Sequence, residues 1–327
     1  MIKFFRQSYA VQYVILALMA IAFWLPSFIV GKVTVDQSSP ATPLFNAVER
    51  MLSFSPYAKL TFAFLLMLVE VLLINATLAE SLIIGKVSLM GGFVYLLLMN
   101  LTRTQVSFYP FALAMLFILL ALREFFKVYQ AQRPELNLLK CGIFIALASM
   151  CYFQSMVLVL WVLMALPMLK KSSLRLELVP VTGFLLAYFL YFSWVFLFGD
   201  FLSLLEGYGE WFSDLRLSVE GFNLKSIILL LFVVASAVLL FLNSGNSSFE
   251  KTVAVRSKMT ASVLLSVFAL ILLFTGDNIL LNALFFLVLT IIIAYEFSYI
   301  NRTSWADLFL AVFILLVFAN HDYFKLM

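Results

Sequence analysis

The segment from Lys32 to Lys59 reads KVTVDQSSPATPLFNAVERMLSFSPYAK and separates one apolar stretch from a long series of others. Within it, Thr42 as N-cap and Pro43 at the first helical position predict a short helix. Its apolar and polar residues fall on opposite faces, which is typical of a helix lying in a membrane interface. The apolar face holds Leu44, Phe45, Val48, Met51 and Leu52, and the polar face holds Asn46, Glu49, Arg50 and Ser53.

The composition excludes a soluble globular fold. Hydrophobic residues make up 65% of the chain, charged residues 12%, and the mean hydropathy is +1.09. So little polar surface cannot cover a globule in water, and lipid is therefore the expected solvent. With one histidine, and with Cys141 and Cys151 both in apolar runs, the sequence predicts no metal site and no cofactor.

The apolar stretches predict an all-α polytopic membrane protein that forms one integral membrane domain over residues 1–327. The first stretch, Ala10 to Val30, is long enough to cross the hydrocarbon and reads as an uncleaved anchor. With those that follow, it gives about eleven transmembrane helices, several of them short enough to be tilted, kinked or paired as hairpins. The later stretches are 58–78, 87–101, 107–122, 138–153, 155–169, 178–199, 225–243, 259–275, 278–295 and 304–320.

The positions of lysine and arginine predict the orientation. If the N-terminus is cytoplasmic, fourteen of the 21 cations lie in cytoplasmic loops and seven lie outside. This places the C-terminus outside, together with the two longest extracytoplasmic loops, 32–57 and 200–224. The basic character of the chain therefore reflects membrane topology, and no basic cluster with interleaved aromatic residues predicts a nucleic-acid partner.

Glu70 is the sharpest single signal for function. It lies near the middle of the stretch from Leu60 to Thr77, where a charged carboxylate is costly, so it is a candidate substrate or ion site. The alternative is a hydrogen-bonded glutamate that fixes helix contacts, with Thr77 as the donor on the same helix face. Gly91 and Gly92 in the next span predict a close approach between helices.

A second set of candidates lies at the predicted outer surface. Asp36 and Glu49 are candidate catalytic bases, and Arg50 is a candidate phosphate ligand beside them. Arg103 and Arg216 are further candidates for binding a phosphate-bearing substrate. The alternatives are solvated loop carboxylates and an Arg103 side chain that only reaches up to the membrane surface. The acidic and aromatic loop 200–224 suits a sugar ligand or an aromatic belt at the interface.

Two stretches resemble a known family. The first begins Phe108-Tyr-Pro110-Phe-Ala-Leu and ends at Arg123, and the second runs from Phe144 through Cys151 to Tyr152 and Phe153. The block from Asn75 to Asp200 that contains them resembles an uncharacterised family of multipass inner-membrane proteins of Bacteroidota-type bacteria. That family brings no activity with it.

The overall organisation is also similar, more distantly, to the GT-C superfamily of polyprenyl-linked glycosyltransferases. The common features are a cytoplasmic N-terminus, one span, an outer loop with an acid, an amphipathic helix and short helical hairpins. This likeness implies a catalytic acid in the first outer loop, at Asp36 or Glu49 by position. The paired acids and the large C-terminal extracytoplasmic domain of that superfamily are absent here.

Together these features predict a bacterial inner-membrane protein of envelope glycan or lipid-carrier biogenesis. The leading hypothesis is a GT-C-like glycosyltransferase with a polyprenyl-phosphate-linked donor held between spans. The first alternative is a transporter or flippase with Glu70 as its intramembrane site. The second is a non-catalytic scaffold or assembly subunit of an envelope complex. The expected partners are membrane lipids, a polyprenyl-phosphate-linked substrate and other envelope proteins.

Overall fold

The computed structural model describes residues 2–7, 9–30, 42–84, 88–101, 110–169, 173–199, 208, 253–271 and 278–299, with single positions at 307, 310, 311 and 314. All regular secondary structure in this part of the chain is helical. The α-helices are α1 (Ile2–Phe5), α2 (Ala10–Val30), α3 (Pro43–Met51), α4 (Pro56–Glu80), α5 (Met90–Leu101), α6 (Pro110–Lys127), α7 (Pro134–Cys151), α8 (Leu158–Ala165), α9 (Leu174–Phe198), α12 (Val253–Ile271) and α13 (Asn278–Tyr299), and the 3-10 helices are η1 (Phe153–Val157) and η2 (Pro167–Leu169).

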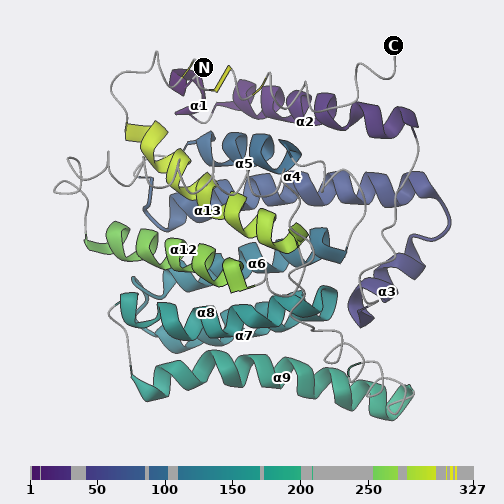
Figure 1. Cartoon of the computed structure of the whole chain (residues 1–327), viewed down its shortest axis with the longest axis vertical. Helices are drawn as coiled ribbons and strands as arrows, with labels where there is room; N and C mark the ends of the chain where they lie inside the picture. Colours follow the sequence, from purple (N-terminus) through teal and green to yellow (C-terminus); the bar gives the residue numbers. More distant parts are fainter. Residues whose placement is uncertain are drawn as a thin grey trace.

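The long helices lie side by side in a stack, with α2 at one edge and α9 at the other (Figure 1). Helix α4 packs against α2, α5 and α6, and α5 also packs against α13. Helix α7 packs against both α6 and α9, and α12 packs against both α13 and α8. Four of the described helices, α2, α4, α7 and α9, are long and apolar enough to cross a membrane. The larger number of about eleven spans stays a prediction, because 225–243 and most of 304–320 lie outside the described residues.

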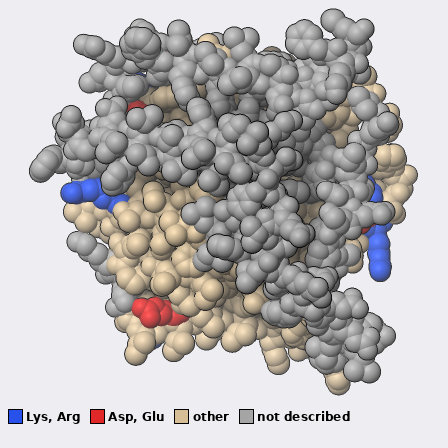
Figure 2. Space-filling model, viewed as in Figure 1, with Lys and Arg blue, Asp and Glu red and all other residues tan. Residues whose placement is uncertain are grey.

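Exposed apolar side chains mark the edges of the stack. On α9 they include Leu185, Phe189, Leu190 and Phe196, each more than half exposed. In Figure 2, the charged side chains visible on this face lie toward the left and right, where the helices of Figure 1 end. The described surface between them is uncharged. An uncharged surface between charged ends, with exposed apolar side chains on α9, suits a lipid environment.

Helix α5 is the innermost element. Residues 88–100 are all buried, and this helix of 12 residues is about 18 Å long, which is too short to cross a hydrocarbon core of about 30 Å. Its first turn is capped by side chains: Ser88 Oγ accepts from Met90 N at 3.2 Å, and Asn75 Oδ1 of α4 accepts from Gly92 N at 2.7 Å. Two of the four amide groups that begin the helix are thereby satisfied by side chains.

The predicted close approach at Gly91 and Gly92 is confirmed. A Cβ at Gly91 would lie 2.4 Å from Leu78 Cδ1, and one at Gly92 would lie 2.3 Å from Asn75 Nδ2. Only glycine lets the backbone of α5 come this near to α4.

Helix α3 begins where the sequence predicts, with Thr42 extended at its N-cap and Pro43 in its first turn. The Thr42 hydroxyl does not cap the helix, because Thr42 Oγ1 donates to the carbonyl oxygen of Cys151 at the end of α7. Phe45 is buried and α3 packs on α7, whereas Met51, predicted on the apolar face, is 78% exposed. The helix is therefore docked on the bundle through part of that face.

The stack also depends on glycines where α7 crosses α9. A Cβ at Gly142 would lie 2.0 Å from the carbonyl oxygen of Pro180, and one at Gly183 would lie 2.4 Å from that of Leu139. Both obstacles are backbone atoms, which cannot rotate away as a side-chain end can. The two helices would have to separate to admit even a methyl group.

Gly142→Ala and Gly183→Ala should therefore each lower the stability of the protein in detergent by about 1–3 kcal/mol, despite the higher helix propensity of alanine. Thermal unfolding measures the loss. Gly199→Ala is the control, because its Cβ would meet the nearest atom at 3.2 Å in an extended conformation that alanine adopts. Equal stability of all three variants would contradict the close packing of α7 on α9.

Candidate functional site

The carboxyl group of Glu70 lies inside the bundle, near the middle of α4. The residue is 1% exposed, and its Oε2 atom accepts a hydrogen bond from Tyr95 Oη of α5 at 2.9 Å. Its Oε1 atom has no hydrogen-bond partner among the described residues, and no lysine or arginine of this set forms an ion pair with it. Within the described part of the chain, Glu70 is therefore a buried acidic group whose one donor is Tyr95.

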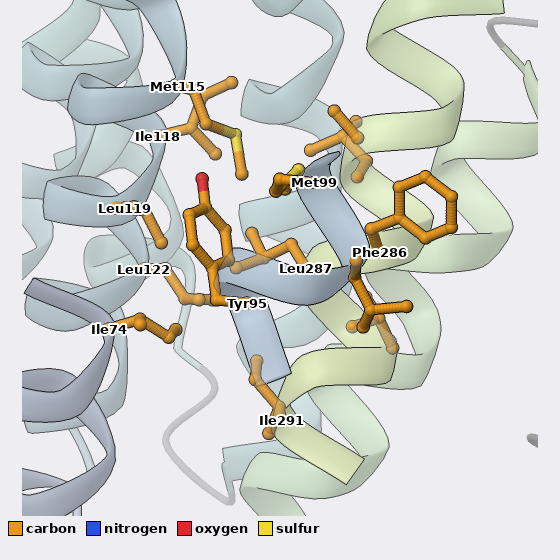
Figure 3. Close-up of a cluster of buried hydrophobic side chains, with 14 of the residues drawn as sticks. Ile74, Tyr95, Met99, Met115, Ile118, Leu119, Leu122, Phe286, Leu287 and Ile291 are labelled. Carbon is orange, nitrogen blue, oxygen red and sulfur yellow. The ribbon is translucent and has the colours of Figure 1, made fainter. Parts of the chain in front are cut away.

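Apolar side chains surround the partner of Glu70. Figure 3 shows the Tyr95 ring with Ile118 and Leu119 of α6 on one side and Leu287 of α13 on the other. Tyr95 and its labelled neighbours are buried in the same core. In such a medium a hydrogen bond is stronger than in water, and an unmet acceptor costs about 1–3 kcal/mol.

Further polar groups follow the contact between α4 and α5. Asn75 Nδ2 and Asn100 Oδ1 are buried without a hydrogen-bond partner in the described part of the chain. Asn100 Nδ2 donates to the carbonyl oxygen of Leu96 at 2.7 Å and approaches Met67 Sδ at 3.7 Å. Trp24 Nε1 of α2 donates to the same sulfur at 3.0 Å. Polar atoms thus accompany α4 for about one turn on either side of Glu70.

Thr77 was predicted as the donor to Glu70, and this is wrong. Its hydroxyl donates to the carbonyl oxygen of Leu73, one turn back on the same helix, at 2.8 Å. Any threonine in a helix can form this local bond. A position seven residues from Glu70 on the same helix face therefore does not make Thr77 its donor. The actual donor, Tyr95, lies on another span, and the sequence alone does not pair the two positions.

The end of α4 at Glu80 carries a cluster of charges. Glu80 pairs with Arg123 of α6 and lies 3.3 Å from Lys127 Nζ, which is also 2.9 Å from Glu124 Oε1. All lie in segments that the sequence assigns to the cytoplasmic side. Surface ion pairs of this kind contribute little stability individually, so the cluster mainly fixes the end of the helix.

Lys258 is one of the fourteen cations predicted to lie in cytoplasmic loops, but the structure buries it. It is fully buried in α12; its Nζ donates to the carbonyl oxygen of Ser81, just past α4, and lies 5.7 Å from the centroid of the Tyr129 ring. In the sequence, the sign of this burial is that Lys258 directly precedes the apolar stretch 259–275. A cation at a helix C-terminus satisfies free carbonyl groups and complements the helix dipole.

The predicted outer-surface site is only partly described. Glu49 Oε1 lies 2.7 Å from Lys59 Nζ in an ion pair, so this carboxylate already has a cationic partner. Arg50 is exposed on α3. Asp36, Arg103 and Arg216 lie outside the described residues, and so does loop 200–224 apart from Tyr208. The structure therefore does not test whether these candidates converge.

Tyr208 contributes to a separate aromatic cluster. Its ring lies 6.1 Å from that of Phe153 and 5.7 Å from that of Phe192, measured between centroids. Tyr188 lies beside it, and the Tyr188 hydroxyl is 2.8 Å from Ser149 Oγ. Burial raises the pKa of Tyr208, so its phenol stays neutral. This cluster ties position 208 to the ends of α7 and α9.

The hydrogen bond between Glu70 and Tyr95 has a measurable consequence. Tyr95→Phe removes the one donor observed for Glu70 among the described residues, at Oε2, and should lower the stability in detergent by about 1 kcal/mol or more. Adding Glu70→Leu to this variant removes the unmet acceptor and should restore stability. The measurement is thermal unfolding of the purified protein.

Tyr57→Phe is the matched control, because Tyr57 lies on α4, the helix of Glu70, and is 56% exposed. It removes an identical hydroxyl from a site outside the core. If Tyr95→Phe unfolds at the same temperature as Tyr57→Phe, the buried hydrogen bond does not contribute to stability.

Comparison of the chain with protein-family models, with curated proteins and with solved structures found no match.

Proposed function

We propose that this chain is a multipass protein of the bacterial inner membrane that works as a proton-coupled carrier, with Glu70 as the group that takes up and releases the proton. The observation that carries the proposal is a carboxyl group buried near the middle of a membrane-length apolar helix, with Tyr95 Oη as its donor and no ion pair to a described lysine or arginine. Acidic groups retained within membrane spans mark proton and ion pathways.

The surroundings of Glu70 favour a proton over a metal cation. Sodium and calcium require several oxygen ligands, whereas Glu70 and the Tyr95 hydroxyl are the oxygen-bearing groups paired here, and the residues around Tyr95 are apolar. No group of three or more acidic, histidine or cysteine side chains in the described residues is arranged to hold a metal ion. A proton needs only the carboxyl group and an exchange partner.

The short helix α5 is a further argument for a carrier. Transporters commonly build their central sites from helices that do not span the membrane, with ends held inside the protein. Helix α5 is short and buried, and its first turn is capped by Ser88 and Asn75. Its glycine contact with α4 lies one to two turns from the carboxyl group of Glu70. A shift of α5 along α4 would change the environment of that group.

The glycosyltransferase hypothesis stays a prediction. Of its two candidate bases, Glu49 is paired with Lys59 and Asp36 lies outside the described residues. No described contact favours a sugar or a polyprenyl phosphate at the outer surface. The scaffold alternative stays open on the same ground, because loop 200–224 is described only at Tyr208.

Glu70→Gln should abolish proton movement through the protein while leaving the fold intact, since glutamine keeps the shape and an acceptor for Tyr95 but cannot exchange a proton. The test uses liposomes that contain the purified protein and a pH-sensitive dye. After an imposed pH jump, the wild-type protein should speed the dye response, and the variant should match protein-free liposomes.

Glu49→Gln is the control. It removes a carboxylate on α3, outside the buried site of Glu70, and should retain the wild-type rate of proton movement. If Glu70→Gln conducts protons as fast as the wild type, Glu70 is not the coupling site. The enzyme and scaffold hypotheses would then remain.

A further inference from the structure

A groove opens between α12 and η2 and has a volume of about 380 Å³. It is lined by Val253, Arg256, Ser257 and Thr260 of α12, and by Met168 of η2. The four α12 positions follow helical spacing and therefore share one face. The groove thus combines a guanidinium group and two hydroxyl groups with an apolar wall.

The Arg256 guanidinium is free to bind a ligand. It is exposed, and it forms no ion pair with any described residue. The hydrogen bond that Thr260 Oγ1 donates, at 2.9 Å, goes to the backbone oxygen of Arg256 and does not involve the guanidinium. A planar guanidinium beside a serine hydroxyl suits the oxygen atoms of a phosphate group.

The groove lies at the charged end of the bundle. Two residues beyond Arg256, Lys258 donates to Ser81, next to the ion pair of Glu80 with Arg123. This is the end that the distribution of cations assigns to the cytoplasm. A phosphate bound by Arg256 would therefore lie at the level of lipid headgroups.

Apolar side chains continue from the groove toward the middle of the stack. On α12, Val263 and Val267 are exposed at helical spacing from Thr260, and on α8, Leu160 and Met164 are exposed at helical spacing from Met168. These four side chains are exposed apolar surface on two helices that pack against each other. A soluble phosphate would gain nothing from this apolar surface, whereas the acyl chains of a lipid would cover it and remove it from water.

We propose that this groove is a binding site for an anionic phospholipid, whose phosphate contacts Arg256 and Ser257 and whose acyl chains lie along α8 and α12. The site is independent of Glu70, and it needs only that this end of the bundle meets a membrane surface. Its ligand class is a diacyl phospholipid whose headgroup carries a net negative charge.

The test measures lipid retained by the purified full chain in detergent by native mass spectrometry, with phosphatidylglycerol and phosphatidylcholine supplied in equal amounts. The wild-type protein should prefer phosphatidylglycerol, and Arg256→Gln should lower that preference by about fivefold or more. Arg133→Gln is the control, because it removes an exposed cation from the α6–α7 turn at the same end of the bundle and should keep the preference.

Thr260→Trp separates binding in the groove from general attraction to charge. Thr260 is exposed, so the larger ring is tolerated, fills the groove and should reduce phosphatidylglycerol retention with every charge still present. Equal losses in Arg256→Gln and Arg133→Gln, or full retention in Thr260→Trp, would overturn the proposal. Inorganic phosphate that stabilises lipid-free protein as much as phosphatidylglycerol does would show that a soluble anion is the ligand, and would overturn it as well.

Discussion

The carboxyl group of Glu70 is held inside an apolar helix bundle by one hydrogen bond, from Tyr95 Oη at 2.9 Å. Its burial constrains the surrounding helices, because a polar group in this position must find its donors within the protein. Helix α5 supplies the donor, and it can do so only because Gly91 and Gly92 let it lie close against α4. The arrangement of α4, α5 and α6 around this pair is therefore a condition for the stability of the core.

The two ends of α4 are stabilised differently. At the end near Glu80, ion pairs with Arg123 and Lys127 and the contact of Lys258 with Ser81 satisfy the helix terminus. At the start of the helix, the ion pair between Lys59 and Glu49 links α4 to α3. Charges at both ends and an apolar middle fit α4 as one of the four described helices that are long and apolar enough to cross a membrane.

The sequence predicted the helical class and many helix positions, since long apolar runs with polar ends dictate both. Ala10 to Val30 was predicted to the residue. Glu70 was recognisable because an acid within an apolar run is costly wherever it lies. Tyr95 was not recognised as its partner, and Lys258 was counted as a loop cation, because both depend on contacts between helices distant in sequence. Orientation and span number follow from cation counts and apolar runs alone, and stay predictions.

The most direct test of the account follows the protonation of Glu70 itself. Infrared difference spectra of the protein in lipid, recorded as the pH is raised from mildly acidic to mildly alkaline, should show loss of the C=O band of a protonated carboxyl group. That band should be absent from Glu70→Gln and should shift in Tyr95→Phe, because the hydroxyl hydrogen bond perturbs it. A Glu70 band that does not respond to pH would contradict proton exchange at this position and leave the residue a purely structural group.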